Sequence, residues 1–212
     1  MKGLLLLLPL ALAACTDSAT DPTAKPLLST ATAPGLHKLT CFDGTTDGGY
    51  GGICTLNFPG APGRATLVLT SSNSSGDYAG VYVANTHLDG QMLSSVTMLG
   101  YRYTGSKAPT PTELSLNLPI DTNDDGATEF YAFIDAAYCG GVAGQVDVIN
   151  DANCGIYAGG TVFYANWAAF VAAYPGAKVT RGELPFIIAE RVPADVPQAW
   201  VVSDVTMGAP GK

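Results

Sequence analysis

Four oxygen-bearing side chains stand close together between two predicted strands. Asp121, Asn123, Asp125 and Glu129 surround a turn at Gly126. Carboxylate and amide oxygens are the ligands that Ca²⁺ prefers, and a glycine lets the backbone wrap around the ion. The spacing therefore predicts a structural calcium site. The alternative is a plain polar turn, for which Asp, Asn and Gly are sufficient.

The same segment resembles the first half of the calcium loop of EF-hand and dockerin-type proteins. It departs from that pattern at Thr128, which replaces an aliphatic residue, and at Ala132, which replaces the final Glu. Its flanks have the alternation of strands and not the period of helices. The resemblance therefore implies calcium ligands in a turn between two strands, and not an EF-hand.

Enzyme motifs are missing from the chain. There is no GxSxG, HExxH, Walker or Rossmann glycine pattern, and the two histidines are His37 and His87. His87 follows a predicted strand in a short polar segment, which is typical of a surface loop. We therefore predict no catalytic residues. Glycoside hydrolysis needs only two carboxylates, so a small hydrolase stays open as an alternative.

Residues 1–14 have the pattern of a secretion signal. Lys2 precedes an apolar run of about a dozen residues, whereas a membrane-spanning helix needs about twenty. The run ends in Leu12-Ala13-Ala14-Cys15, which resembles the lipobox of bacterial lipoproteins. The resemblance implies lipidation of Cys15 and a membrane anchor in the bacterial cell envelope, at the outer membrane or cell surface. The alternative is an ordinary signal peptide cleaved near Ala14.

The next segment, residues 15–35, is rich in Ser, Thr, Ala and Pro. It holds too little apolar surface to fold, so we predict a flexible tether, followed by a single domain of residues 36–212. The chain has a formal net charge of −8 and no basic cluster, which argues against nucleic acid as a partner. Between Lys107 and Lys178 every charged residue is acidic, which is typical of a solvated face and favours cations.

Four cysteines remain when Cys15 is set aside. An even number in an exported chain predicts disulfides rather than a zinc site or a thiol nucleophile. Each neighbouring pair encloses a glycine-rich stretch that can fold back as a loop. Of the three possible pairings, we therefore predict Cys41–Cys54 and Cys139–Cys154.

The body of the chain is a series of short alternating or β-branched runs separated by turn residues. Hydrophobic residues make up 47% and charged residues 13%, with 25 Gly and 14 Pro, which favours strands and turns over long solvated helices. Alternation over residues 114–120 predicts a half-buried strand. The predicted strands are 36–41, 64–70, 78–84, 95–103, 113–120, 129–135, 145–149, 161–164, 185–190 and 199–207.

One segment has helical period. Trp167, Phe170, Val171 and Tyr174 fall at i, i+3, i+4 and i+7, and Asn166 can cap the start. Many strands and one short helix predict an all-β fold, a two-sheet antiparallel β-sandwich. We expect a jelly-roll-like topology rather than an immunoglobulin-like one because the number of strands is high.

The C-terminal stretches NWAAFVAAYPGAKV, PFIIAE and AWVVSDVTMG resemble the closing part of secreted concanavalin-like and carbohydrate-binding-module-like sandwiches. The resemblance covers residues 166–208 and implies the fold alone.

Three functions are consistent with these patterns. We expect a surface-tethered, non-catalytic envelope lipoprotein that binds a glycan or another envelope partner or has a structural role. The first alternative is a calcium-assisted carbohydrate-binding module, and the second is a small extracytoplasmic hydrolase. The aromatic side chains available to a carbohydrate-binding module are Tyr78, Tyr82, Tyr101, Tyr103 and Trp200, and the alternative for all five is packing against the sheet.

A first prediction concerns the anchor. Replacing Cys15→Ser should release the protein from membranes or detergent into the aqueous phase, because multiple acyl chains on Cys15 would hold it firmly. Phase partitioning of the expressed protein measures this. Unchanged partitioning of the variant would contradict the lipoprotein interpretation.

Overall fold

The computed structural model describes residues 37–44, 51–57, 63–69, 77–190 and 198–210. The chain divides into a unit of residues 1–32 and a unit of residues 33–212, and the described residues belong to the second. The predicted signal, Cys15 and the tether lie outside the described residues. Within them, no helix is long and apolar enough to cross a membrane.

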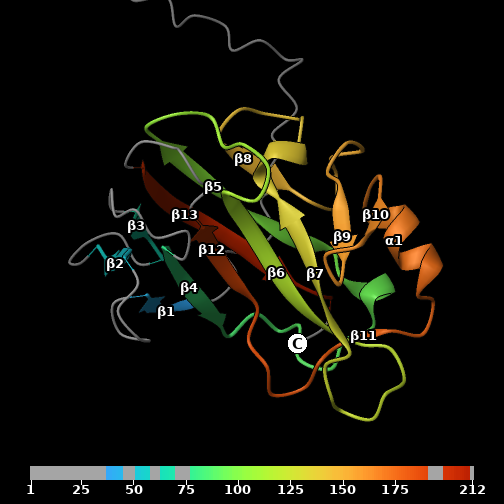
Figure 1. Ribbon diagram of the computed structural model, residues 1–212. Helices are drawn as coiled ribbons and strands as arrows, with labels where there is room; N and C mark the ends of the chain where they lie inside the picture. The colour runs from blue at the N-terminus through green and yellow to red at the C-terminus, as the bar shows by residue number, and fades with distance from the viewer. Residues whose placement is uncertain (1–36, 45–50, 58–62, 70–76, 191–197, 211–212) are drawn as a thin grey trace, which may run out of the picture. The chain divides into compact units, whose positions relative to one another are not determined.

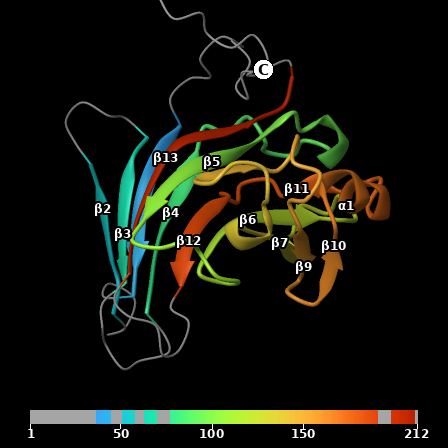
Figure 2. The same cartoon turned by 90° about the horizontal axis from the view of Figure 1, so that it is seen from above.

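The described residues form two antiparallel β-sheets. The eight-stranded sheet has the order β1 (Lys38–Asp43), β4 (Tyr78–Ala84), β12 (Phe186–Glu190), β6 (Leu114–Asp121), β7 (Phe130–Asp135), β9 (Ile156–Ala158) and β10 (Val162–Tyr164), with β11 (Lys178–Val179) also paired to β6. The five-stranded sheet has the order β2 (Ile53–Leu56), β3 (Ala65–Leu69), β13 (Gln198–Gly208), β5 (Met98–Gly105) and β8 (Gln145–Asp147). Figures 1 and 2 show both sheets. The predicted all-β sandwich is confirmed.

The last two strands of the chain occupy central positions. β12 lies between β4 and β6, and β13 lies between β3 and β5. In Figure 1 the orange-red β12 runs beside the yellow-green β6. The chain also crosses from one sheet to the other between β4 and β5 and again between β5 and β6, which is a jelly-roll-like connectivity. Both sheets are therefore completed only by the C-terminal residues.

The core lies between the sheets. Leu114, Leu116 and Leu118 of β6 are fully buried, and burial of each such side chain stabilises the fold by about 1.5–3 kcal/mol. Trp200 of β13 is the largest fully buried side chain. Its ring lies against Gly105 of β5, where an added Cβ would be 2.0 Å from Trp200 Cε3. A glycine is therefore required where these two strands pair.

The predicted helix is confirmed. It is α1 (Trp167–Ala173), and the Asn166 side-chain oxygen accepts a hydrogen bond from the Ala169 N–H at 3.0 Å. There are also two short 3₁₀ turns. η1 (Leu93–Ser95) precedes β5, and η2 (Ala136–Tyr138) follows β7.

Each of the ten predicted strands overlaps an observed one, but β2, β9 and β11 were missed. These strands have only two to four residues, too few for alternation to be recognised. The predicted half-burial of residues 114–120 is wrong, because every residue of β6 is buried.

Candidate functional site

Aromatic side chains gather on the face of the eight-stranded sheet that is turned away from the five-stranded sheet. Because successive side chains of a strand point to opposite faces, the residues beside the buried core positions share this face. Its rings, which we call the aromatic face, are Phe42, Tyr78, Tyr82, Tyr131, Phe133, Tyr157, Phe163 and Phe186.

A single cross-strand row contains most of these rings. The register aligns Thr40, Tyr82, Phe186, Asn117, Phe133, Tyr157 and Phe163 on seven neighbouring strands. At about 4.8 Å between strands, the row spans roughly 29 Å. The aromatic face is therefore long enough for an extended ligand.

The rings of the aromatic face form two groups of contacts, one around Tyr82 and one around Tyr157. Ring centroids lie 4.5 Å apart for Phe42 and Tyr82, 5.9 Å for Tyr82 and Phe186, and 5.0 Å for Tyr157 and Phe163. The rings are also partly solvent-accessible: Tyr82 is 39% exposed and Phe163 is 50% exposed. Because apolar side chains gathered and exposed on one sheet are common at interaction sites, the aromatic face is a candidate binding surface.

The outer face of the five-stranded sheet has a different character. Its positions carry residues such as Ile53, Thr66, Val68, Arg102 and Val201. None of its described residues is aromatic. The concentration of rings is therefore a property of one sheet and not of the sandwich in general.

A pocket of about 290 Å³ lies at one end of the aromatic face. It adjoins the start of β6 and is lined by Thr112, Ser115, Phe133, Asp135, Tyr138, Tyr157, Gly160 and Glu190. The lining combines aromatic walls with hydroxyl and carboxyl groups. This mixture is typical of sites that bind polar organic molecules.

Asp135 is held rigidly in this pocket. One carboxylate oxygen accepts a hydrogen bond from the Thr112 N–H, and the other accepts one from the Ala137 N–H at 3.0 Å. Thr112 has a φ of 72°, which is unusual and strained for a β-branched residue. Burial raises the pKa of Asp135, the two hydrogen bonds oppose the rise, and the charge of Glu113 adds to it.

Glu190 provides the second carboxyl group. Its backbone N–H donates to the Glu113 carbonyl at 3.0 Å, which places Glu190 beside the start of β6. Partial burial raises the pKa of Glu190, and the nearby charge of Asp135 adds to the rise. Glu113 itself is fully buried, and its carboxylate lies 2.6 Å from the Lys107 ammonium group. Lys107 therefore balances the negative charge of Glu113.

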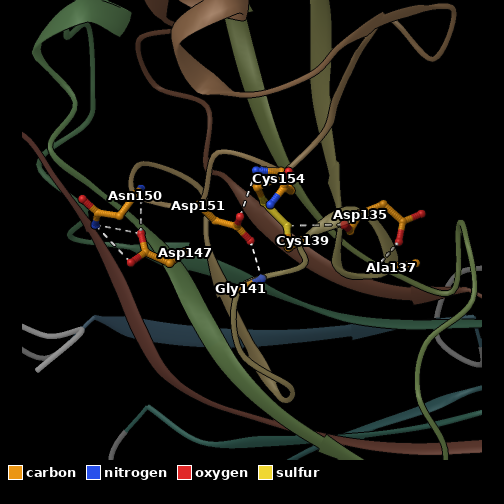
Figure 3. The surroundings of a disulfide bond; sticks show 9 residues. Asp135, Ala137, Cys139, Gly141, Asp147, Asn150, Asp151 and Cys154 are labelled. Atoms are coloured by element: carbon orange, nitrogen blue, oxygen red, sulfur yellow. Dashed lines mark hydrogen bonds between the residues drawn. A yellow bond between two sulfur atoms is a disulfide. The ribbon is translucent and has the colours of Figure 1, made fainter. Parts of the chain in front are cut away.

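The disulfide Cys139–Cys154 supports one wall of the pocket. Tyr138 immediately precedes Cys139, and its carbonyl accepts the Gly155 N–H at 3.2 Å. Figure 3 shows how Asp151 braces the enclosed loop by accepting the Gly141 N–H at 2.8 Å, while Asp147 contacts Asn150. The disulfide therefore fixes the chain directly after Tyr138 and three residues before Tyr157.

Both predicted disulfides are present. The second, Cys41–Cys54, joins β1 of the eight-stranded sheet to β2 of the five-stranded sheet. Although it closes a local loop, it therefore connects the two layers.

The acidic turn between β6 and β7 brings together three of its four predicted ligands. Oxygen atoms of Asp121, Asp125 and Glu129 all lie within 4.8 Å of one another. Asn123 lies in the same turn, where its side-chain oxygen accepts the Asp125 N–H at 3.0 Å. Hard carboxylate oxygens at this separation fit a Ca²⁺ ion chemically.

The carboxylates of the turn are also used by its backbone. Asp121 accepts N–H groups of Asn123, Asp124 and Gly126. Burial opposes ionisation of Asp121, but these hydrogen bonds outweigh it and lower its pKa. The turn is thus ordered by its own side chains. The neighbouring Asp124 pairs instead with Lys178 at 2.5 Å.

Only part of the predicted aromatic set lies on the surface. Tyr78 and Tyr82 belong to the aromatic face, but Tyr101 and Trp200 are 1% and 0% exposed in the core, and Tyr103 packs against it. For these three residues the alternative of packing against the sheet is the one observed. Sequence reasoning missed the remaining rings of the aromatic face, which only the strand register brings into line.

The two histidines, for which we predict no catalytic role, have different surroundings. His37 is buried, with Nδ1 3.1 Å from the Asn85 carbonyl and Nε2 accepting the Met207 N–H at 3.2 Å. Burial lowers the pKa of His37, which is consistent with a neutral structural role. His87 is exposed.

No model of a known protein family matches the chain, and no curated protein matches its sequence. The function is therefore inferred from the residues of the aromatic face, the pocket and the acidic turn.

A second prediction concerns the wall of the pocket. The double replacement Cys139→Ser and Cys154→Ser should lower the free energy of unfolding by about 3 kcal/mol, as expected for a loop of 15 residues. Amide hydrogen exchange near Tyr138 and Gly155 should become faster. The control replaces Cys41 and Cys54, which should loosen β1 and β2 instead. Equal exchange at Gly155 in both variants would show that Cys139–Cys154 does not support the pocket.

Proposed function

We propose that the chain is a lipid-anchored protein of the bacterial cell envelope that binds a carbohydrate on the aromatic face. The observation that carries the proposal is the row of rings beside a pocket with hydroxyl and carboxyl groups. Sugar rings present C–H groups that pack on aromatic faces, and their hydroxyls need polar partners. The aromatic face and its pocket offer both over the length of several sugar units.

The proposed location is supported by the lipobox-like sequence at Cys15 and by the two disulfides. Disulfides persist in oxidising compartments outside the cytoplasm. A tether of residues 15–35 would let the domain reach glycans away from the membrane surface.

A third prediction tests the binding surface. The purified domain should bind members of a glycan array, and Phe163→Ala should weaken that binding about tenfold, since an exposed ring that stacks on the ligand contributes roughly 1.4 kcal/mol. The matched control is Ile53→Ala, because Ile53 is 46% exposed on the other sheet. Absence of binding, or equal losses in both variants, would contradict the proposal. Release of reducing ends from a bound glycan would instead favour the hydrolase alternative.

A second proposed property is a structural Ca²⁺ ion in the acidic turn. Asp121, Asp125 and Glu129 would supply carboxylate oxygens, and Asn123 would supply an amide oxygen. The ion would offset repulsion among the carboxylates and hold the hairpin between β6 and β7. The Thr128 hydroxyl of this turn is hydrogen-bonded to the Thr180 hydroxyl at 2.8 Å. The ion would therefore also stabilise the segment that leads into β12.

A fourth prediction follows for calcium. At 100 times its dissociation constant, Ca²⁺ should stabilise the fold by about 2.7 kcal/mol and raise Tm by about 5–10 °C. Asp125→Asn should remove most of this rise while keeping the acceptor for the Ala127 N–H. Asp124→Asn is the control, since it removes the same charge from the same turn but not a proposed ligand. A shift below about 1 °C at Ca²⁺ concentrations well above the millimolar affinities typical of extracellular modules would identify a plain polar turn.

A further inference from the structure

The pocket beside the aromatic face is acidic without a matching positive charge. Asp135 and Glu190 are its ionisable carboxyls, and none of its described lining residues is Lys, Arg or His. Lys107, which lies near the start of β6, is paired with Glu113. Glu190 makes no ion pair or side-chain hydrogen bond with the described part of the chain. The pocket therefore holds negative charge that no described cation compensates.

The two carboxyl groups converge on the same short segment. The Asp135 carboxylate accepts a hydrogen bond from the Thr112 N–H, and the Glu190 N–H donates a hydrogen bond to the Glu113 carbonyl. Thr112 and Ser115 line the pocket together with these two carboxyl groups. Both side chains line the same pocket, and the charge of Asp135 adds to the effect of burial in raising the pKa of Glu190. A ligand cation seated between the two would relieve this repulsion.

The aromatic walls suit the same kind of ligand. Tyr138 and Tyr157 lie with ring centroids 5.8 Å apart, and both line the pocket together with Phe133. The negative face of an aromatic ring attracts an ammonium group, most strongly where water is partly excluded. Carboxylates and ring faces in one pocket are the combination that recognises an organic ammonium ion.

We propose that this pocket binds a protonated amino group, so that the glycan bound by the aromatic face is one whose sugars carry free amines. The inference rests on the proposed carbohydrate binding and adds its specificity. The amine would donate to Asp135 and Glu190, while the sugar rings extend along the row through Phe133, Asn117 and Phe186.

The test compares three oligosaccharides of the same length and β-1,4 linkage. They are built from glucosamine, N-acetylglucosamine and glucose, and binding is measured by calorimetry near pH 6 with the complete folded domain. The glucosamine oligomer should bind at least about tenfold more tightly than the other two, because a hydrogen bond between charged groups is worth more than one between neutral groups. Added salt should reduce this difference.

The matched variants are Glu190→Gln and Asp204→Asn. Each removes one negative charge, but Asp204 lies on β13 of the other sheet, where its exposed side chain is 4.0 Å from Arg102. Glu190 is chosen over Asp135 because Asp135 also anchors the backbone. Glu190→Gln should weaken binding of the glucosamine oligomer about tenfold and leave binding of the N-acetylglucosamine oligomer unchanged. Asp204→Asn should change neither.

The outcomes separate this inference from the proposed function. Equal or tighter binding of the acetylated or glucose oligomer would overturn the amine specificity and leave carbohydrate binding intact. If Glu190→Gln binds the glucosamine oligomer as tightly as the unaltered protein does, the amine specificity is also overturned while carbohydrate binding stands. If glycans without free amines are the only ligands on the array, the specificity is again wrong. If the array shows no ligand at all, the proposed function and this inference both fail.

Discussion

Strand β6 is buried on both faces, and this constraint shapes the rest of the sandwich. One face carries Leu114, Leu116, Leu118 and Ile120 into the core. The opposite face carries small or compact residues, among them Ser115 and Asn117, which are also buried. Because these residues do not fill the space above the sheet, the larger rings of the flanking strands cover them. The pocket and the aromatic face follow from this difference in side-chain size.

Much of the architecture could be predicted from sequence because it depends on local patterns. Alternation identified the longer strands, and the spacing of Trp167, Phe170 and Asn166 identified the helix and its cap. The burial of β6 could not be predicted in this way. Its alternation of Leu with Ser and Asn is typical of a strand with one wet face. The cover comes from Phe133 and Phe186, which lie far away in sequence and meet Asn117 only through the strand register.

The candidate site shows the same limit. The acidic turn is contiguous in sequence, so its converging carboxylates were predictable from spacing. The pocket draws Asp135 and Glu190 from strands on opposite sides of β6, and no local pattern connects them. The sequence also left open whether Tyr101 and Trp200 lie on the surface or in the core. A strand with alternating residues has the same sequence pattern whichever face is buried, and only the packing of the two sheets decides this.

The long acidic run between Lys107 and Lys178 was expected to be one solvated surface, but its members have separate structural tasks. Glu113 is a buried ion-pair partner, Asp121 organises a turn, Asp135 anchors Thr112, and Asp151 braces a disulfide loop. Each carboxylate is compensated by N–H groups or by a lysine. Glu190 lies outside that run and makes no such bond with the described residues, although the fold places it beside Asp135. Glu190 is exposed at the edge of the pocket, so water hydrates its carboxylate and a ligand can reach it, whereas Asp135 is buried and its carboxylate is already used by the backbone.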